Sequence, residues 1–540
     1  MSSAATAATG TGSPRPQQPA AADGARLTRA LAWAAAIGIG SSILIMIAAS
    51  AVRHSPAVPL MPWPPGWPPV ELGGRLPVTA TYAALWAAAV LGGGGVIAGL
   101  AAVARGARFP ARLLITAAFV VVAAFAMLPP AGSTDTLNYA TFGRIAVLGH
   151  NPYVMTPNQL ARTGDPIGDL ATQIWRRHGS LYGPLATAEQ RAAAELGGTS
   201  PARIIFWLKL WNAIIFLGVV VGLDRLLRSD PARRARAHLL WSLNPLVLWG
   251  LMASGHLDAF AAAAGFFGLA IVRCRRAGPQ PGSPPGSPPG SPPGPAEPAR
   301  RGPEPLVALA AGLLVGVAAD FMLTYLLLAL ALAWGLRRWP AALLSAGAGL
   351  AVAVVPAYLW VGSPLVHSLL LRRGKVSADN FYQLFSTAYR HPLPPSADLA
   401  VVLVFAAMAL LLLWRLPDAV PDLPALQPAL AIGIAWLLVW YYQLPWYDVM
   451  IIALLALYPG SRLDYVMMVQ LTAGTVAMMP GGSPLEPPLG WLRTFSHEIW
   501  FTWTPIVLLG CVAAVIALCL TGAWKFGPRS GTGQPVRAGA

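Results

Sequence analysis

Charged residues are scarce in this chain. Of its 540 residues only 11% are Asp, Glu, Lys or Arg, whereas 56% are hydrophobic, and the mean hydropathy is +0.58. Soluble globular proteins carry roughly a quarter charged residues. The composition therefore predicts a polytopic membrane protein.

Acidic residues are scarcer still than basic ones. Asp and Glu number 21 against 37 Lys and Arg, which gives a formal net charge of +16. Much of the excess lies in short segments between apolar runs, such as residues 105–112 and 224–238, where the positive-inside rule predicts cytoplasmic loops. The positive charge therefore indicates membrane topology, and we predict no nucleic-acid partner.

Several signatures of common enzyme classes are missing. The three cysteines are Cys274, Cys511 and Cys519, two in an apolar helix and one beside a basic loop, so no disulfide framework is implied. The chain has no Walker A sequence and no Gly-x-Gly-x-x-Gly between a strand and a helix. It also has no His-Glu-x-x-His or Cys-x-x-Cys spacing. We predict no metal site and no cofactor, and the dependence on divalent metal is left open.

Apolar runs define a long membrane domain between two polar tails. Residues 1–27 are rich in Ala, Thr, Gly, Pro and Gln and are predicted to form a disordered cytosolic tail, and residues 526–540 a second cytosolic tail. Residues 28–525 contain about fourteen spans in this interpretation, within a range of twelve to fifteen. The predicted fold class is an all-α polytopic membrane protein with short broken hairpins, extracytoplasmic interfacial helices and both termini cytoplasmic.

Two apolar segments are interrupted by polar residues. Residues 239–272 contain Ser-Gly-His-Leu-Asp, ending at Asp258, and residues 306–336 contain Asp320. Two full spans do not fit comfortably into the first segment at about 1.5 Å per residue, and the second presents the same problem. Each is therefore predicted to form a short helical hairpin that lines a cavity. Between them, residues 278–303 are rich in Pro, Gly and Ser and are predicted to be a cytosolic spacer, with a ligand for a signalling domain as the alternative.

The largest mixed polar segment, residues 129–202, is predicted to lie outside the cell, because the basic loops on either side of it belong inside. Within it, residues 134–148 have the pattern of a short amphipathic helix, with Thr134 as N-cap and Asp135 in the first turn. Such a helix would lie along the membrane surface. From this stretch alone, a connecting loop and an active site are both open interpretations.

Ionisable and aromatic residues gather at the predicted outer edge of the membrane, whereas the inner edge has arginines and little else. The outer set is Asp135, Arg144, His150, His256, Asp258, Asp320, Arg372, Lys375, Trp446, Tyr447 and Asp448. Taken singly, His256 could be a satisfied polar contact at a hairpin tip, Asp448 a helix cap, and Arg372 part of a solvated loop. Their location on the same predicted side of the membrane favours a functional site there.

Several short motifs follow one another in a recognisable order. Asp135 precedes Asn-Tyr-Ala-Thr-Phe-Gly-Arg, and Gly-His-Asn-Pro-Tyr, Tyr-Gly-Pro, Asn-Pro-Leu, Gly-His-Leu-Asp and Leu-Pro-Trp-Tyr-Asp follow. Together they resemble the GT-C superfamily of integral-membrane glycosyltransferases. More narrowly, they resemble the actinobacterial polyprenyl-phosphomannose-dependent α-1,6-mannosyltransferases that build the mannan cores of cell-envelope lipoglycans. The resemblance covers roughly residues 28–525.

The resemblance implies a hexosyltransferase of the plasma membrane. It would move mannose from a polyprenyl-phosphate donor to a glycan or lipoglycan acceptor on the extracytoplasmic face, forming an α-1,6 linkage. Asp135 falls on the position of the family's catalytic base. The donor phosphate needs basic groups, and Arg144, Arg372, Arg373 and Lys375 lie on the outer side. The residues expected to bind donor or acceptor are Asn138, Tyr139, Arg144, His150, Asn151, Tyr153, Tyr182, His256, Asp258, Arg372, Arg373, Lys375, Trp446, Tyr447 and Asp448.

One position departs from the family pattern, because related sequences often have a basic residue in the hairpin where this chain has Asp320. Two alternatives to the mannosyltransferase stay open. One is a GT-C transferase for another sugar, such as arabinose or glucose. The other is a transporter or lipid flippase, a class that often contains internal inverted repeats; no convincing repeat is present in this sequence.

Overall fold

The computed structural model of the protein describes residues 19–59, 68–173, 175–276, 300–370, 374–377, 380–385, 394–481 and 489–524. Part of what the sequence predicts lies outside these ranges. This holds for both ends of the chain, for Arg372 and Arg373, and for most of the Pro-rich stretch 278–303.

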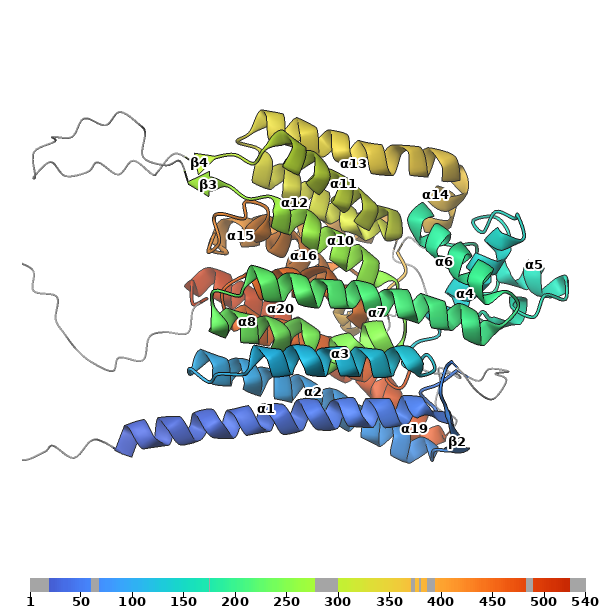
Figure 1. Cartoon of the computed structure of the whole chain (residues 1–540), viewed down its shortest axis with the longest axis horizontal. Coiled ribbons are helices and arrows are strands. Elements are labelled where there is room, and N and C mark those ends of the chain that lie inside the picture. The colour runs from blue at the N-terminus through green and yellow to red at the C-terminus, as the bar shows by residue number, and fades with distance from the viewer. Residues whose placement is uncertain are drawn as a thin grey trace, which may run out of the picture.

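The chain folds into a bundle whose long helices run side by side (Figure 1). In chain order, the helices are α1 (Pro19–Ala51), α2 (Val78–Ala104), α3 (Ala111–Met127), α4 (Asp135–Val147), α5 (Pro157–Arg162), α6 (Pro184–Gly197), α7 (Pro201–Leu226), α8 (Pro231–Ala237), α9 (Pro245–Leu248), α10 (Asp258–Ile271), α11 (Pro305–Phe321), α12 (Leu326–Leu336), α13 (Pro340–Val361), α14 (Ser363–Leu370), α15 (Pro395–Arg415), α16 (Leu426–Val439), α17 (Val449–Leu457), α18 (Arg462–Met478), α19 (Gly490–Glu498) and α20 (Thr504–Thr521).

Strands are few and short in the described ranges. β1 (Val52–His54) pairs in parallel with β2 (Leu72–Arg75). β3 (Arg275–Arg276) pairs antiparallel with β4 (Arg300–Arg301), so the Pro-rich stretch leaves and rejoins the bundle at one point. This arrangement is compatible with the predicted role of residues 278–303 as a spacer, which stays a prediction.

Six helices of the described chain are long and apolar enough to cross a membrane, judged by length and composition. They comprise Asp23–Ala51, Val78–Ala104, Pro201–Leu226, Pro340–Val361, Ser396–Arg415 and Gly490–Thr521, and six shorter apolar helices of 10–17 residues accompany them. The predicted class, an all-α polytopic membrane protein, is confirmed. The count of about fourteen spans stays a prediction. A single span takes roughly 17–25 residues, and the six shorter helices have only 10–17.

The first helix begins earlier than the sequence predicts. The expected tail ends at residue 27, whereas α1 starts at Pro19. Thr28 Oγ1 donates a hydrogen bond to Gly24 O (2.9 Å), which joins the added part of the helix to the predicted span. The disordered-tail prediction is therefore wrong for residues 19–27. The apolar span supplies a helix nucleus, and the helix propagates backwards through an alanine-rich segment at little cost.

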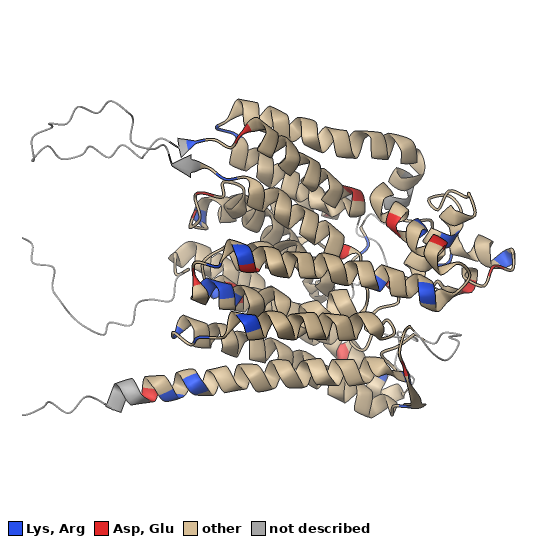
Figure 2. Cartoon of the chain, viewed as in Figure 1, with Lys and Arg blue, Asp and Glu red and all other residues tan. Residues whose placement is uncertain are grey.

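The connections between helices lie at two opposite ends of the bundle (Figure 1). One end, called here the α8 end, holds α8, β3, β4 and the start of α1. The other, called the α4 end, holds α4, α5, α6, α14 and α19. Lys and Arg gather around α8 and the adjacent end of α7 in Figure 2. Residues 129–202 and the described parts of 273–305 therefore lie at opposite ends.

Both interrupted apolar segments are broken helices, as predicted. In the first, a π-helical turn (Trp249–Ala253) leads to a tip at residues 254–257, and α10 begins at Asp258. Gly255 in the tip has φ 71°, and a Cβ there would lie 3.0 Å from Lys209 Cγ, so the turn needs glycine. In the second, α11 ends at Phe321, and Met322 is extended before a short 3₁₀ turn.

Helix α4 does not lie along a surface. Most of its 13 residues are buried, among them Asn138, Tyr139 and Thr141. It packs closely on α6 because residue 143 is glycine; a Cβ there would lie 2.1 Å from Gln190 O. The predicted amphipathic surface helix exists but its placement is wrong. Its polar side chains find partners inside the protein, as Thr141 Oγ1 does at Leu137 O (2.9 Å).

The start of α4 also differs in detail from the prediction. Thr134 occupies the N-cap position, but its side chain accepts no hydrogen bond from the helix. Instead Ser133 Oγ accepts the N–H of Asp135 at 3.2 Å. The predicted helix boundary is thus confirmed, while the capping group is the neighbouring hydroxyl.

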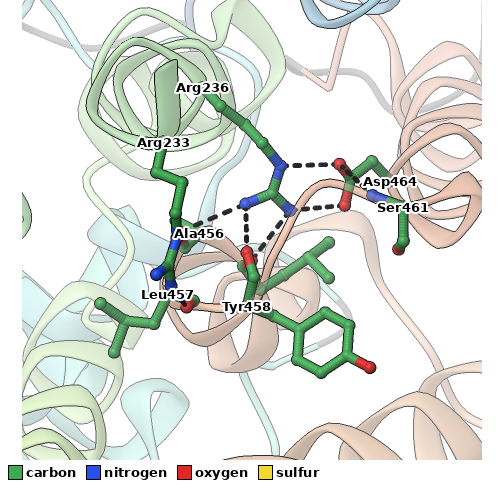
Figure 3. A network of polar contacts seen from close by, with 8 residues as sticks. Arg233, Arg236, Ala456, Leu457, Tyr458, Ser461 and Asp464 are labelled. Atoms are coloured by element: carbon green, nitrogen blue, oxygen red, sulfur yellow. Dashed lines mark hydrogen bonds and ion pairs between the residues drawn. The ribbon is translucent and has the colours of Figure 1, made fainter. Parts of the chain in front are cut away.

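A buried arginine of α8 joins α17 and α18 (Figure 3). Arg236 forms a two-point ion pair with Asp464 of α18, with N–O distances of 2.7 and 2.6 Å. Its remaining N–H groups donate to carbonyls at the end of α17, those of Leu455 (3.0 Å), Ala456 (3.3 Å) and Tyr458 (2.6 Å). The guanidinium therefore links the last turn of α17, where Leu455 O also accepts the N–H of Tyr458 (3.0 Å), to the start of α18.

Two further contacts complete this network. Arg233, one turn earlier in α8, donates to Leu457 O. Asp464 accepts the N–H of Ser461 at 3.3 Å in a capping box that starts α18. Three helix ends thus share one set of hydrogen bonds at the α8 end.

Candidate active site

The loop before α4 and the first turn of α4 are hydrogen-bonded to the tip of the first broken hairpin. Ala131 N–H donates to Ala253 O at 2.9 Å, and Thr136 Oγ1 donates to Ser254 O. These contacts set the start of α4, which carries Asp135, directly beside the residues that precede His256.

Two buried polar side chains of α7 brace the same junction. Lys209 Nζ donates to Leu128 O (2.7 Å) and Pro129 O (3.1 Å), at the end of α3. Asn212 Nδ2 donates to Gly255 O (3.1 Å) in the hairpin tip. Buried polar groups that are hydrogen-bonded in this way fix geometry, so α7 holds the two segments of the site in register.

Asp135, His256 and Asp258 come together at this junction. His256 Nδ1 lies 3.8 Å from Asp135 Oδ2 and 3.8 Å from Asp258 Oδ2. Asn138 Nδ2 donates to Asp135 Oδ1 at 3.4 Å. The fold thus unites four residues that the sequence predicts for the site, although they come from segments far apart in the chain.

Aromatic rings enclose His256. Its ring stacks on Trp446 with centroids 4.1 Å apart, and Tyr139 OH lies 3.3 Å from its Nδ1. Tyr139 in turn meets Tyr182 edge to face at 5.0 Å. His256 is only 1% exposed, and its Nε2 has no hydrogen-bond partner among the described residues. The imidazole is therefore held in one orientation by packing.

A cavity of about 390 Å³ opens next to this cluster. Its walls are formed by Asp135, Trp175, Leu181, Tyr182, Met322, Leu323, Thr324, Leu370, Lys375, Trp440, Tyr441, Tyr442, Leu444 and Tyr447. Among these described residues, Asp135 is the one acid and Lys375 the one base, and most of the others are apolar or aromatic. The cavity thus presents one carboxylate and one ammonium group within a largely apolar wall.

The two tyrosines beside Asp135 stay protonated. Burial raises the pKa of the Tyr139 and Tyr182 phenols well above their usual value, and the neighbouring carboxylates of Asp135 and Asp258 raise them further. Both hydroxyls can therefore donate hydrogen bonds at neutral pH.

Arg144 lies away from the cavity wall. Its Nε donates to Asp165 Oδ2 at 2.8 Å, and the two side chains are 15% and 8% exposed. Asp165 Oδ1 also accepts the N–H of Ile167 (2.9 Å), which organises the loop after α5. The contact that the structure gives Arg144 is therefore a structural ion pair.

Asp448 is absent from the cavity wall and is fully buried. It occupies the first position before α17, but its side chain makes no capping bond and instead accepts from Gln470 Nε2 of α18 at 3.1 Å. The helix-cap interpretation is therefore wrong for its side chain. Its sequence neighbour Tyr447 does line the cavity.

The remaining predicted residues fall into two groups. His150, Asn151 and Tyr153 line a second, separate cavity. Arg372 and Arg373 lie outside the described residues, so their predicted role at the donor phosphate stays a prediction.

Several residues at the site are absent from the predicted set. Trp175, Tyr441 and Tyr442 line the cavity, and Lys209 braces it. Lys209 could have been found, because an ionisable residue within an apolar span is a functional candidate by default. The aromatic residues carried no signal, since aromatic side chains are common at both membrane edges. In the described part of the chain, no group of three or more His, Cys, Asp or Glu side chains is arranged to hold a metal ion.

Comparison with known proteins identifies the family. A profile described as alpha-(1->6)-mannopyranosyltransferase, N-terminal domain, matches residues 35–338, which is more than half of the chain. The chain belongs to this family. It is a GT-C mannosyltransferase that transfers mannose with formation of an α-1,6 linkage. Neither the curated proteins nor the solved structures gave a match.

The match covers one part of the candidate site. Asp135, Tyr182, His256 and Asp258 lie within the matched region, whereas Lys375 and residues 446–448 lie beyond it. The family confirms the predicted sugar and linkage, and it decides against the arabinose, glucose and transporter alternatives.

Proposed function

We propose that this mannosyltransferase takes mannose from a polyprenyl-phosphate donor and adds it to a cell-envelope glycan or lipoglycan on the extracytoplasmic face of the plasma membrane. The observation that carries the proposal is the cavity in which Asp135 is the one acid among the described lining residues. Its lining residues Asp135 and Tyr182 belong to α4 and to the segment before α6, at the α4 end, whereas Lys and Arg gather around α8 at the opposite end.

The cavity suits a donor with a lipid tail, a phosphate and a sugar. Met322, Leu323 and Leu370 supply an apolar wall for an isoprenoid chain, and Lys375 supplies a cation for the phosphate. A nucleotide sugar is not expected outside the cell, so a transferase on that face needs a membrane-borne donor.

The transfer follows from the place of Asp135. Its carboxylate accepts the proton of the acceptor C6 hydroxyl while that oxygen bonds to C1 of mannose. The bond between C1 and the phosphate oxygen breaks, and polyprenyl phosphate leaves with the electron pair. Because the donors of this family are β-linked, one displacement inverts the configuration and produces the α-1,6 linkage.

The position of the second carboxylate supports a single displacement. A double displacement needs a nucleophile beside the sugar, about 5 Å from the other carboxyl group in hydrolases. Asp258 Oδ2 lies 3.8 Å from His256 Nδ1, and Asp258 is 1% exposed and does not line the cavity. We assign Asp258 and His256 to orienting Asp135, through the 3.8 Å contacts that flank the imidazole.

The proposal is tested with purified full-length protein in nanodiscs. Radiolabelled polyprenyl-phosphomannose and GDP-mannose are supplied in parallel with short α-1,6-linked mannosides. We expect extension of the mannosides only with the polyprenyl donor. Extension with GDP-mannose alone would overturn the donor assignment while leaving the family reaction intact.

Lys375 is predicted to contact the donor phosphate. Replacing it with glutamine should raise the apparent KM for the donor by about tenfold, because a charge-assisted contact to the phosphate is lost from a solvent-accessible position. Initial rates over a range of polyprenyl-phosphomannose concentrations measure this. The Lys375→Arg variant keeps the charge and should stay near the wild-type KM. An unchanged KM in Lys375→Gln would assign the phosphate to another basic group.

The membrane orientation is tested by labelling introduced cysteines. Thr163, in the loop after α5, and Ser229, between α7 and α8, are both exposed and lie at opposite ends of the bundle. The native Cys274, Cys511 and Cys519 are buried. In intact cells, a membrane-impermeant maleimide should label Thr163→Cys and leave Ser229→Cys unlabelled until the membrane is opened. The reverse pattern would place the cavity on the cytoplasmic side.

A further inference from the structure

A second cavity lies on the other side of the turn formed by residues 182–184. Its volume is about 360 Å³, and its walls include His150, Asn151, Thr187, Ala188, Arg191 and Trp360. Neither Asp135 nor Lys375 lines it. The donor chemistry described above therefore makes no use of this cavity.

We propose that the second cavity binds the acceptor glycan at sugar units remote from the one that reacts. The proposal rests on the proposed function, because it assumes that the acceptor is a carbohydrate chain. It assigns a carbohydrate subsite to residues 149–153, to one face of α6 and to the end of α13.

The side chains of this cavity fit a neutral sugar. Trp360 is 73% exposed, so its ring is available to pack against the apolar face of a pyranose. His150 and Asn151 are exposed and can exchange hydrogen bonds with sugar hydroxyls. The Tyr153 and Thr187 hydroxyls bond to each other (2.8 Å), and burial raises the pKa of Tyr153 to about 12, which keeps its phenol neutral.

Charge argues against an anionic ligand here. Arg191 is the one Lys or Arg among the described lining residues, and its Nε donates to Glu195 at 2.8 Å. This exposed pair already neutralises the cation. An anionic lipid headgroup would therefore meet no Lys or Arg in the described wall that lacks an acidic partner, whereas a neutral glycan needs none.

The wall between the two cavities is thin. Tyr182 lines the first cavity and Pro184 the second, and the Cα atoms of residues two apart are separated by no more than about 7 Å. Gly183 N–H donates to Phe321 O (3.2 Å), and a Cβ at Gly183 would lie 1.9 Å from Asp320 O. Glycine in the Tyr-Gly-Pro motif thus allows the turn to lie flat against the second hairpin.

The length of α4 sets the size of the acceptor that would fill both sites. Asp135 begins this helix, and Gly149 and His150 follow its end, so they are about 20 Å apart at 1.5 Å per residue. A chain of several sugars could extend from the reacting hydroxyl at Asp135, over the turn at residues 182–184, to Trp360. A disaccharide would reach only the first cavity.

Binding without a donor tests the subsite independently of transfer. Isothermal titration of the full-length protein in nanodiscs compares an α-1,6-linked mannose disaccharide with the hexasaccharide. Wild type should bind the hexasaccharide more tightly by about tenfold, the scale of one aromatic contact with accompanying hydrogen bonds. Ala188→Trp, which fills the cavity, and Trp360→Ala, which removes its aromatic wall, should both abolish this difference.

The matched control is Leu359→Ala, one residue before Trp360. Leu359 is 77% exposed but does not line the cavity, so this variant should keep the tighter binding of the hexasaccharide. The proposal is overturned if wild type binds both sugars equally, or if Ala188→Trp and Trp360→Ala retain the difference. It is also overturned if anionic lipid in the nanodisc abolishes the difference in wild type, which would assign the cavity to a lipid headgroup.

Transfer assays separate this proposal from the proposed function. With polyprenyl-phosphomannose as donor, both cavity variants should keep the wild-type kcat/KM for the disaccharide and lose the advantage of the hexasaccharide. Loss of transfer to the disaccharide as well would overturn a separate subsite. If wild type used no polyprenyl donor at all, the donor assignment would fail, and the titration would still decide whether the cavity binds sugar.

Discussion

Replacing Asp135 with asparagine is expected to reduce mannosyl transfer by roughly a hundred- to ten-thousand-fold, the usual contribution of general acid–base catalysis. Asparagine has the same shape and cannot accept the proton of the acceptor hydroxyl. The amount of folded protein and the binding of donor should stay unchanged. Single-turnover transfer from radiolabelled polyprenyl-phosphomannose measures the effect.

The competing interpretation gives Asp135 only a structural role at the start of α4. Its N–H bonds to Ser133 Oγ, and its Oδ1 accepts from Asn138 Nδ2. Asparagine retains the first contact and a carbonyl oxygen for the second, so a structural role predicts little change. Asp169→Asn is the matched control, because Asp169 lies in the same polar segment, is 72% exposed and is absent from the cavity wall. An Asp135→Asn enzyme with most of its activity would contradict the assignment of the base and leave Asp135 with a structural role.

Replacing Arg236 with leucine is expected to destabilise the protein by about 3–5 kcal/mol, the usual cost of leaving one partner of a buried ion pair behind. The Arg236 and Asp464 side chains are 5% and 3% exposed. The substitution would remove the charge partner of the Asp464 carboxylate, which would keep the N–H of Ser461. It would also take one hydrogen bond from each of the carbonyls of Leu455, Ala456 and Tyr458. A lower thermal unfolding midpoint and less folded protein after purification measure the effect.

Two further variants show how much of the loss of stability comes from burying an unpaired charge. Arg191→Gln breaks an ion pair whose side chains are 56% and 50% exposed, and it should change stability by less than about 1 kcal/mol. The double variant Arg236→Leu with Asp464→Leu removes both charges and should recover part of the loss. Recovery should be incomplete, because Asp464 also belongs to the capping box of α18. A single variant as stable as wild type would show that the network is dispensable.

The order of residues was enough to predict the class of the protein and most of its helices. Apolar runs are read directly from residue order, because a span must satisfy its backbone hydrogen bonds within itself and face lipid with its side chains. Both broken hairpins were also predictable, since polar residues interrupt segments of limiting length. The motifs from Asp135 to Asp448 carried the family resemblance, and the matched profile over residues 35–338 covers all of them except Leu-Pro-Trp-Tyr-Asp.

Which residues contact one another depends on how the helices pack. The sequence placed Arg144, His150 and His256 on one predicted side, but it held no information on distance across the bundle. The fold sets His256 beside Asp135, pairs Arg144 with Asp165, and moves His150 to a second cavity. These outcomes depend on close approach of backbones, as at Gly143 on α6 and at Gly183 on the second hairpin.

The burial of α4 was likewise decided by packing and not by local pattern. A polar helix next to a membrane domain fits an interfacial location by its composition. The partners that bury it come from other segments, namely α6, the loop at Asp165 and the tip at Ser254. A hydrogen bond to a distant segment leaves no periodicity in the sequence. The residue order therefore predicted that Asp135 lies at the start of a helix, but it could not predict that its carboxylate lines a cavity.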